Sequence, residues 1–300
     1  MPNLPAYDLL ALKQIHEWKH PSVGWLGKKL QLLNRPLDKA GDLLLDTPGV
    51  GTVIKKSVEG LTSICNDAAQ WSVRPEAIFE EFRKAGHENV KSHADIVDLP
   101  LEEVDKVVGW LAAKYKGIAA AEGAGAGAAG ALGLVVDIPA LIALNLRAVG
   151  EYAAYYGFDT TRQEERLFAL NTLGLASSPT DASKALAMSQ LVRLAQDVAK
   201  KVTWNELEKN VFVKLVQEIA KALGIRLTKA KLAQAIPMVG AAVGGGFNAY
   251  FTSKVCDAAY QLYRERFLAQ KHGANVIDAA VKPAATFDAE FPDVDLKKAL

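Results

Sequence analysis

Apolar residues recur at steps of three and four along much of this 300-residue chain, a spacing that gathers them on one face of an α-helix. Residues 51–71 show the pattern most clearly, with apolar side chains at Ile54, Val58, Leu61, Ile64, Ala68 and Trp71. Pro100 predicts a further helix running toward Tyr115. The Thr-x-x-Glu spacings at Thr161 and Thr203 predict two more helix starts. No segment has the alternating pattern of a β-strand, so we expect an all-α fold.

Two apolar passages repeat the same order of features, in which spaced glycines precede a helix that carries tyrosines in its last turns. The glycines are Gly123, Gly127 and Gly130 in the first passage, and Gly240, Gly244, Gly245 and Gly246 in the second. Glycine costs a helix about 1 kcal/mol relative to alanine, so this density predicts close helix crossings. We expect a multi-helix bundle over residues 1–270 with two glycine-rich, closely packed apolar helical segments. Periodicity then fades, which predicts a flexible tail over residues 271–300.

The charge balance and the cysteines limit the partners and the compartment. Lys plus Arg total 35 against 34 for Asp plus Glu, so no overall charge favours a nucleic acid. Cys65 and Cys256 lie in separate helix-like segments, which fits a reducing compartment. The first residues lack the pattern of a secretory signal. We therefore expect a cytoplasmic protein.

Both apolar passages make poor membrane spans. Residues 232–253 are long enough to cross a bilayer, but they contain Pro237 and four glycines. Residues 123–146 are interrupted by Asp137, and an acid at bilayer depth costs at least ~2.5 kcal/mol. A hairpin or a segment that enters one leaflet is still compatible with these passages, which would place the protein peripherally on the inner membrane.

Residues 16–20 (HEWKH) match H-E-x-x-H, in which two histidines on one helical face bind zinc and the glutamate acts as general base. Pro21 disfavours helical geometry at His20, and no third ligand is evident. We therefore expect a polar first helix with two exposed histidines. A zinc-dependent hydrolase at His16 and His20 is the alternative.

Other enzyme motifs lack their context or are absent. Residues 125–130 satisfy G-x-G-x-x-G, but no strand precedes them as a dinucleotide site requires. The chain contains no G-x-x-x-x-G-K-[ST] and no G-x-S-x-G. We expect no cofactor and assign no catalytic residue.

Ionisable residues associated with the apolar passages are more informative. They are Glu122, Asp137, Arg147 and Glu151 in the first passage and Asp257, Arg264 and Glu265 after the second. A buried carboxylate needs a partner, so Asp137 is expected to pair with a cation, Arg147 being the natural candidate, or with amides at its helix start. Such a pair either fixes the helix register or forms a polar spot in an apolar groove that binds a lipid headgroup or another amphiphile. The tyrosines likewise predict either a core or an interfacial belt.

The run EGAGAGAAGALGLVVDIPALIALNLRAVGEYAAYYGFD resembles the central signature of the EcsC family, in which an E-G pair, spaced glycines and D-I-P lead into a helix ending in Y-G-[FY]-D. IPMVGAAVGGGFNAYF resembles a later stretch of that family, and EWKHPS resembles its beginning. The resemblance covers about residues 10–270. Residues that it implies are Glu122, Gly123, Gly127, Asp137, Pro139, Arg147, Gly157, Pro237, Gly240, Gly244 and Asn248.

The resemblance implies a cytoplasmic accessory protein near a membrane, because the family takes its name from an operon that also encodes an ABC transporter. It implies no defined reaction, and the histidines of HEWKH are not typical of the family. We expect a non-enzymatic, membrane-associated or lipid-binding helical protein linked to transport or secretion, with membrane lipid or an amphiphile and a membrane transporter as partners. A protein-binding scaffold is a further alternative. Expected ligand-binding residues are Glu122, Gly123, Gly127, Asp137, Arg147, Gly240, Gly244 and Asn248.

Overall fold

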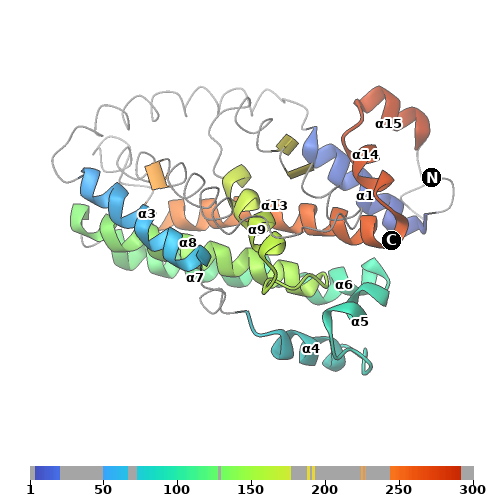
Figure 1. The fold of residues 1–300 in the computed structure, drawn as a ribbon, viewed down its shortest axis with the longest axis horizontal. Coiled ribbons are helices and arrows are strands. Elements are labelled where there is room, and N and C mark those ends of the chain that lie inside the picture. Colours follow the sequence, from blue (N-terminus) through green and yellow to red (C-terminus); the bar gives the residue numbers. More distant parts are fainter. Residues whose placement is uncertain are drawn as a thin grey trace.

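The computed structural model describes residues 4–20, 50–66, 73–127, 130–176 and 244–291, together with residues 188–189, 191–192, 224–225 and 227. All regular structure within these ranges is helical, which confirms the predicted all-α class (Figure 1). The helix predicted over residues 51–71 is α3 (Val50–Asn66). The helix start predicted at Thr203, and the predicted site residue Gly240, lie outside the described residues.

Three long helices form the centre of the fold: α7 (Leu111–Gly127), α8 (Gly130–Tyr155) and α13 (Gly244–His272) (Figure 1). α7 and α8 run antiparallel, because Lys114 near the start of α7 contacts Glu151 near the end of α8, with 2.7 Å between Nζ and Oε2. The glycines that the sequence singles out therefore lie at the C-terminal end of α7, near the start of α8.

α13 runs parallel to α8. Near the two helix starts, Nδ2 of Asn248 donates a hydrogen bond of 3.1 Å to Oδ1 of Asp137. Further along, the rings of Tyr152 and Tyr260 meet edge to face with centroids 6.5 Å apart. The start of α13 thus lies beside the first half of α8, and the tyrosine-bearing turns further along the two helices also lie side by side.

Shorter helices surround these three. They are α1 (Ala6–Lys19), α4 (Pro75–Lys84), α5 (His93–Asp98), α6 (Leu101–Val108), α9 (Gln163–Ala176), α14 (Asn275–Ala280) and α15 (Ala284–Glu290). α3 and α9 pack against α8, whereas α1, α14 and α15 lie together near the C-terminal end of α13 (Figure 1). α9 begins two residues after Thr161. The helix predicted from Pro100 begins as expected but ends at Val108, and α7 begins three residues later.

The end of α8 is set by a glycine in the left-handed region. Gly157 has a φ of +82°, the amide of Phe158 donates to the carbonyl of Ala153 (2.8 Å), and the amide of Gly157 donates to the carbonyl of Ala154 (3.1 Å). This pair of bonds is the Schellman motif, which satisfies the last carbonyl groups of a helix. The Y-G-F-D part of the family signature therefore ends α8.

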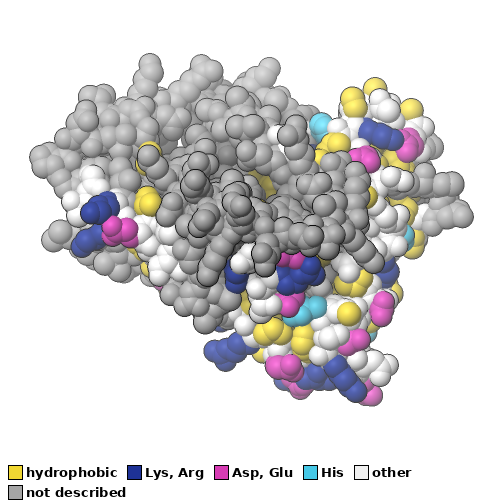
Figure 2. Space-filling model, in the orientation of Figure 1, with side chains coloured by type: hydrophobic (Ala, Val, Ile, Leu, Met, Phe, Trp, Pro, Cys, Tyr) yellow, Lys and Arg dark blue, Asp and Glu magenta, His cyan; other side chains and the backbone are white. Residues whose placement is uncertain are grey.

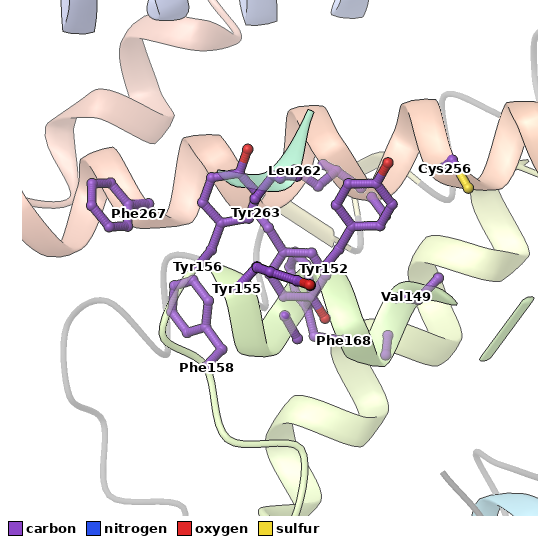
Figure 3. Packing of buried hydrophobic residues seen from close by; sticks show 14 of the residues in the cluster. Val149, Tyr152, Tyr155, Tyr156, Phe158, Phe168, Cys256, Leu262, Tyr263 and Phe267 are labelled. Carbon is purple, nitrogen blue, oxygen red and sulfur yellow. The ribbon is translucent and has the colours of Figure 1, made fainter. Parts of the chain in front are cut away.

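The aromatic core lies where α8, α9 and α13 meet (Figure 3). Tyr155 and Tyr156 near the end of α8 are almost completely buried, as are Phe168 in α9 and Tyr263 and Phe267 in α13. Burial raises the pKa of Tyr155, Tyr156 and Tyr263, so the hydroxyl groups of these three tyrosines stay protonated. Of the two interpretations offered by the sequence, the structure places these tyrosines in the core.

Three consecutive charged residues of α13 are buried and join that helix to three others. Arg264 pairs with Asp105 of α6 (Nε–Oδ2 2.9 Å), Glu265 pairs with Lys19 of α1, and Arg266 pairs with Glu165 of α9. The guanidinium of Arg266 donates two parallel bonds of 2.6 and 2.7 Å to Glu165. Buried charges of this kind fix the relative position of helices, because any other packing leaves a charge unpaired.

Residues 271–291 belong to the segment for which the sequence predicts a flexible tail, and the structure describes helices there. α14 and α15 form there, and Val276, Ile277 and Phe287 are buried. Phe287 stacks on the ring of His16 in α1, with centroids 3.9 Å apart. The apolar residues are too widely spaced for a long periodic run, but two short helices suffice to bury them against α1 and the end of α13.

Candidate functional site

The structure brings three of the predicted site residues together where α7, α8 and α13 cross. Asn248 of α13 bonds to Asp137 of α8, and both side chains are buried. A Cβ added to Gly123 of α7 would lie 2.9 Å from Nδ2 of Asn248. The glycine is therefore required by the close approach of the asparagine, in agreement with the predicted helix crossing.

Replacement of Gly123 by alanine is expected to lower the free energy of unfolding by about 1–3 kcal/mol, because the added methyl group displaces Asn248 from Asp137. Urea denaturation measures the change. Gly117 in the same helix is the matched control, since no atom lies within 4 Å of its added Cβ. Gly117→Ala should raise stability by about 0.5–1 kcal/mol through helix propensity alone. Equal gains in both variants would contradict the close crossing.

The other predicted glycines and Glu122 lie near this crossing along the chain. Gly127 is the last residue of α7 and Gly244 is the first residue of α13. Glu122 lies on the exposed side of α7, where partial desolvation raises the pKa of its carboxyl group. Pro139 in α8 is in contact with α3, since a Cβ added to Gly60 would lie 3.6 Å from the proline Cβ.

Arg147 is not part of the crossing. Its Nε lies 3.4 Å from Oε1 of Glu151, one turn further along α8, and Lys114 reaches the same carboxylate. Ten residues of helix separate Asp137 from Arg147, a rise of about 15 Å, so their side chains do not meet. Asp137 therefore does not pair with Arg147, the natural candidate, and Asn248 donates a hydrogen bond to its carboxylate.

His16 and His20 are not arranged as a metal pair. His16 is buried rather than exposed as predicted, and its Nε2 lies 2.9 Å from the carbonyl oxygen of Lys282. α1 ends at Lys19, and His20 has non-helical angles (φ −119°, ψ 59°), as Pro21 predicts. No group of three metal-ligating side chains is found within the ranges that the structure describes. Zinc binding through Nε2 of His16 would require breaking its bond to Lys282.

The first helix instead serves to anchor the N-terminal region on α13. Trp18 Nε1 donates a 2.8 Å hydrogen bond to Asp257, and Lys19 pairs with the buried Glu265. Asp8 lies 2.7 Å from Nε2 of His272 at the far end of α13. The side chains of HEWKH therefore serve mainly to pack α1 against the C-terminal helices and to anchor it on α13.

A hollow of about 310 Å³ opens between α4 and α6, away from the crossing. Trp110, 44% exposed, lies at its edge, and charged side chains of both signs gather over these helices (Figure 2). Lys106 pairs with Glu102 and Glu103 at 2.9 Å, so these charges compensate one another locally. None of the predicted site residues lines this hollow.

Exposed apolar side chains occur close to the crossing. Tyr250 of α13 is 61% exposed and lies two residues after Asn248; Ile118 of α7 is 38% exposed and lies five residues before Gly123. Nζ of Lys254 lies 5.7 Å from the centroid of the Tyr250 ring. No helix in the described ranges is long and apolar enough to cross a membrane.

The sequence interpretation missed two completely buried polar residues, Asn145 of α8 and Thr252 of α13. Their signal is present in the sequence, because each is a polar residue within an otherwise apolar passage. Asp105, Glu165 and Arg266 were also missed. No local sequence pattern predicts that these residues are buried, since each is paired with a residue about a hundred or more positions away.

Comparison with known proteins identifies a family and two relatives. The EcsC protein family matches residues 10–268. An uncharacterized protein of Bacillus subtilis, YdbA, is 26% identical over 277 residues, which cover 90% of this chain and 97% of that protein. Protein EcsC of Bacillus subtilis is 28% identical over 193 residues, covering 64% of this chain and 76% of that protein. No solved structure matches this chain.

Proposed function

We propose that this chain, which belongs to the EcsC protein family, is a non-enzymatic accessory protein that associates peripherally with membrane lipid through the exposed side chains near the α7–α13 crossing. It is cytoplasmic, is located at the inner membrane, and supports a membrane transporter there. The family alone defines no reaction, so the argument for lipid depends on the surface of this chain.

The observation that carries the proposal is the exposure of Tyr250, at 61% the most exposed large apolar side chain in the ranges that the structure describes. Tyrosine combines an apolar ring with a polar hydroxyl and is favoured at membrane interfaces. Ile118 offers a second apolar side chain on the neighbouring helix. Both lie within about two helical turns of the contact between Gly123 and Asn248.

Lysines accompany these apolar side chains. Lys116 precedes Ile118 by two residues, Lys254 follows Tyr250 by four, and both lysines are exposed. A lysine near an anionic bilayer surface contributes about 1 kcal/mol of attraction, which salt screens. The balanced net charge of the chain therefore does not prevent a local attraction to anionic lipid.

Sedimentation with vesicles of mixed anionic and zwitterionic phospholipid tests the location. Tyr250→Ser is expected to reduce the partition constant of the protein onto vesicles by about 5-fold, the effect of losing roughly 1 kcal/mol of apolar contact. Ile118→Ser should act in the same direction, because its side chain is exposed on the adjacent helix.

Trp110→Ser is the matched control, since Trp110 is also an exposed aromatic residue but directly precedes α7, about 20 Å from Gly123 along the helix axis. It should leave vesicle binding unchanged. Equal losses for the Trp110 and Tyr250 variants would show that the crossing is not the contact surface. Capture of a protein partner without vesicles, unaffected by Tyr250→Ser, would favour the scaffold alternative.

A further inference from the structure

The hollow between α4 and α6 contains a carboxylate that has no cation beside it. Glu81 of α4 lines the hollow and is half-buried. Its Oε2 accepts a hydrogen bond from the hydroxyl of Tyr155, the last residue of α8. Among the residues that the structure describes, no basic side chain forms an ion pair with Glu81. A partly desolvated carboxylate that is bonded only to a neutral phenol attracts a cation from outside.

The two lysines that line the hollow are engaged by other carboxylates. Nζ of Lys106 lies 2.9 Å from both Glu102 and Glu103, and Nζ of Lys84 lies 3.8 Å from Glu80. The charged side chains of the hollow and of these ion pairs are Glu80, Glu81, Glu102, Glu103, Arg83, Lys84 and Lys106. Four carboxylates against three basic groups leave one negative charge.

An aromatic ring lies at the edge of the same hollow. Trp110 follows α6 by two residues, and its side chain is exposed. Nζ of Lys114 lies 5.0 Å from the centroid of the indole ring and is itself held by Glu151 at 2.7 Å. Aromatic rings attract cations, and the accessible part of this indole is open to a further one.

The size of the hollow suits a small group on a wall that is already formed. Its volume of about 310 Å³ is at the low end of the range of about 300–1,000 Å³ for ligand pockets. The bond from Tyr155 holds the Glu81 carboxylate, and the ring of His87 packs against Phe82 with centroids 6.2 Å apart. A preformed wall lowers the entropic cost of binding.

We propose that this hollow binds a guanidinium group, carried either by a small organic cation or by an arginine side chain of a partner protein. A guanidinium forms two parallel hydrogen bonds with a carboxylate and stacks on aromatic rings, so it matches both Glu81 and Trp110. An ammonium group is more strongly hydrated and lacks the planar shape. None of the residues proposed to contact lipid lines the hollow, so this site and the membrane association stand or fall separately.

Titration of N-acetyl-arginine amide into the full chain, without vesicles, tests the site. The indole N–H signals of the five tryptophans are followed by NMR, and Trp110→Phe assigns the signal of Trp110. This signal should shift saturably. N-acetyl-citrulline amide has nearly the same shape but no charge, and it should bind at least about 10-fold more weakly. Absence of a saturable shift, or equal binding of the two compounds, would overturn the proposal.

Glu81→Gln removes the charge but keeps a polar group beside Tyr155, and it should raise the dissociation constant of N-acetyl-arginine amide about 10-fold. Glu76→Gln is the matched control, since Glu76 is an exposed carboxylate of α4 that does not line the hollow. It should leave the dissociation constant unchanged. Equal weakening in both variants would refute a specific site. If Glu81→Gln does not fold, the comparison of arginine with citrulline on the unmodified chain decides.

Two further guanidinium probes distinguish the sources of the group. Methylguanidine presents the cation alone, and the blocked tripeptide Gly-Arg-Gly presents it on a peptide. Tighter binding of the tripeptide supports an arginine of a partner protein, whereas binding of methylguanidine at least as tight supports a small organic cation. Failure of both probes to bind would overturn the guanidinium site.

Discussion

Replacement of Glu165 by alanine is expected to lower the free energy of unfolding by about 3–5 kcal/mol, because it leaves a buried guanidinium without its counter-charge. Arg266 is surrounded by aromatic rings, with its Cζ 4.0 Å from the centroid of Phe158 and 4.3 Å from that of Phe168. Urea denaturation followed by circular dichroism measures the change.

Two comparisons separate a lost ion pair from a general effect of mutation. Glu80→Ala removes a carboxylate that pairs with Arg83 on the exposed surface of α4, and it should leave stability almost unchanged. The double replacement of Glu165 by leucine and Arg266 by methionine should recover most of the loss, since it removes both charges. A single Glu165→Ala variant as stable as Glu80→Ala would contradict the buried pair.

Replacement of Gly157 by alanine is the second change with a large expected effect, a loss of about 2–5 kcal/mol. The left-handed conformation of Gly157 costs a residue with a side chain about 1–2 kcal/mol. In addition, the new Cβ would lie 2.6 Å from Cγ2 of Val97 and 2.7 Å from the carbonyl oxygen of His93, and such overpacking costs about 1–3 kcal/mol. The helix α8 would lose its end, and α5 would be displaced from it.

Gly273 provides the control for this prediction. It also has a positive φ, of +95°, but no atom lies within 4 Å of its added Cβ. Gly273→Ala should therefore cost only the conformational part, about 1–2 kcal/mol. The difference between the two variants measures the contact of Gly157 with α5, and equal losses would rule that contact out. Thermal or urea unfolding of both variants gives the comparison.

The sequence predicts the helices of this fold well where the signal is local. Each of these signals lies within a few residues of the helix that it predicts, because helix formation depends on neighbours along the chain. Examples are the apolar spacing of α3, the proline before α6 and the glycine after α8. The short helices α14 and α15 were missed. They are stabilised by packing on α1, which no local pattern reveals.

The candidate site likewise contains features that a local sequence pattern predicts and contacts that it does not predict. Spaced glycines predict close helix packing, and Gly123 indeed lies against Asn248. Arg147, the natural candidate for a cation beside Asp137, lies too far along the same helix to meet it, whereas the structure supplies a hydrogen-bond donor 111 residues away, Asn248. Long-range pairs such as Asp105 with Arg264 arise only from tertiary packing. Sequence reasoning can name the polar residues of an apolar passage, but it cannot say which of them meet.

Sedimentation of the unmodified full chain with anionic phospholipid vesicles is the most direct measurement of the proposed membrane association. We expect the protein to pellet with vesicles well above its vesicle-free background, and the bound fraction to fall as salt screens Lys116 and Lys254. Protein that stays in the supernatant at every lipid concentration and at low salt would contradict the proposed function.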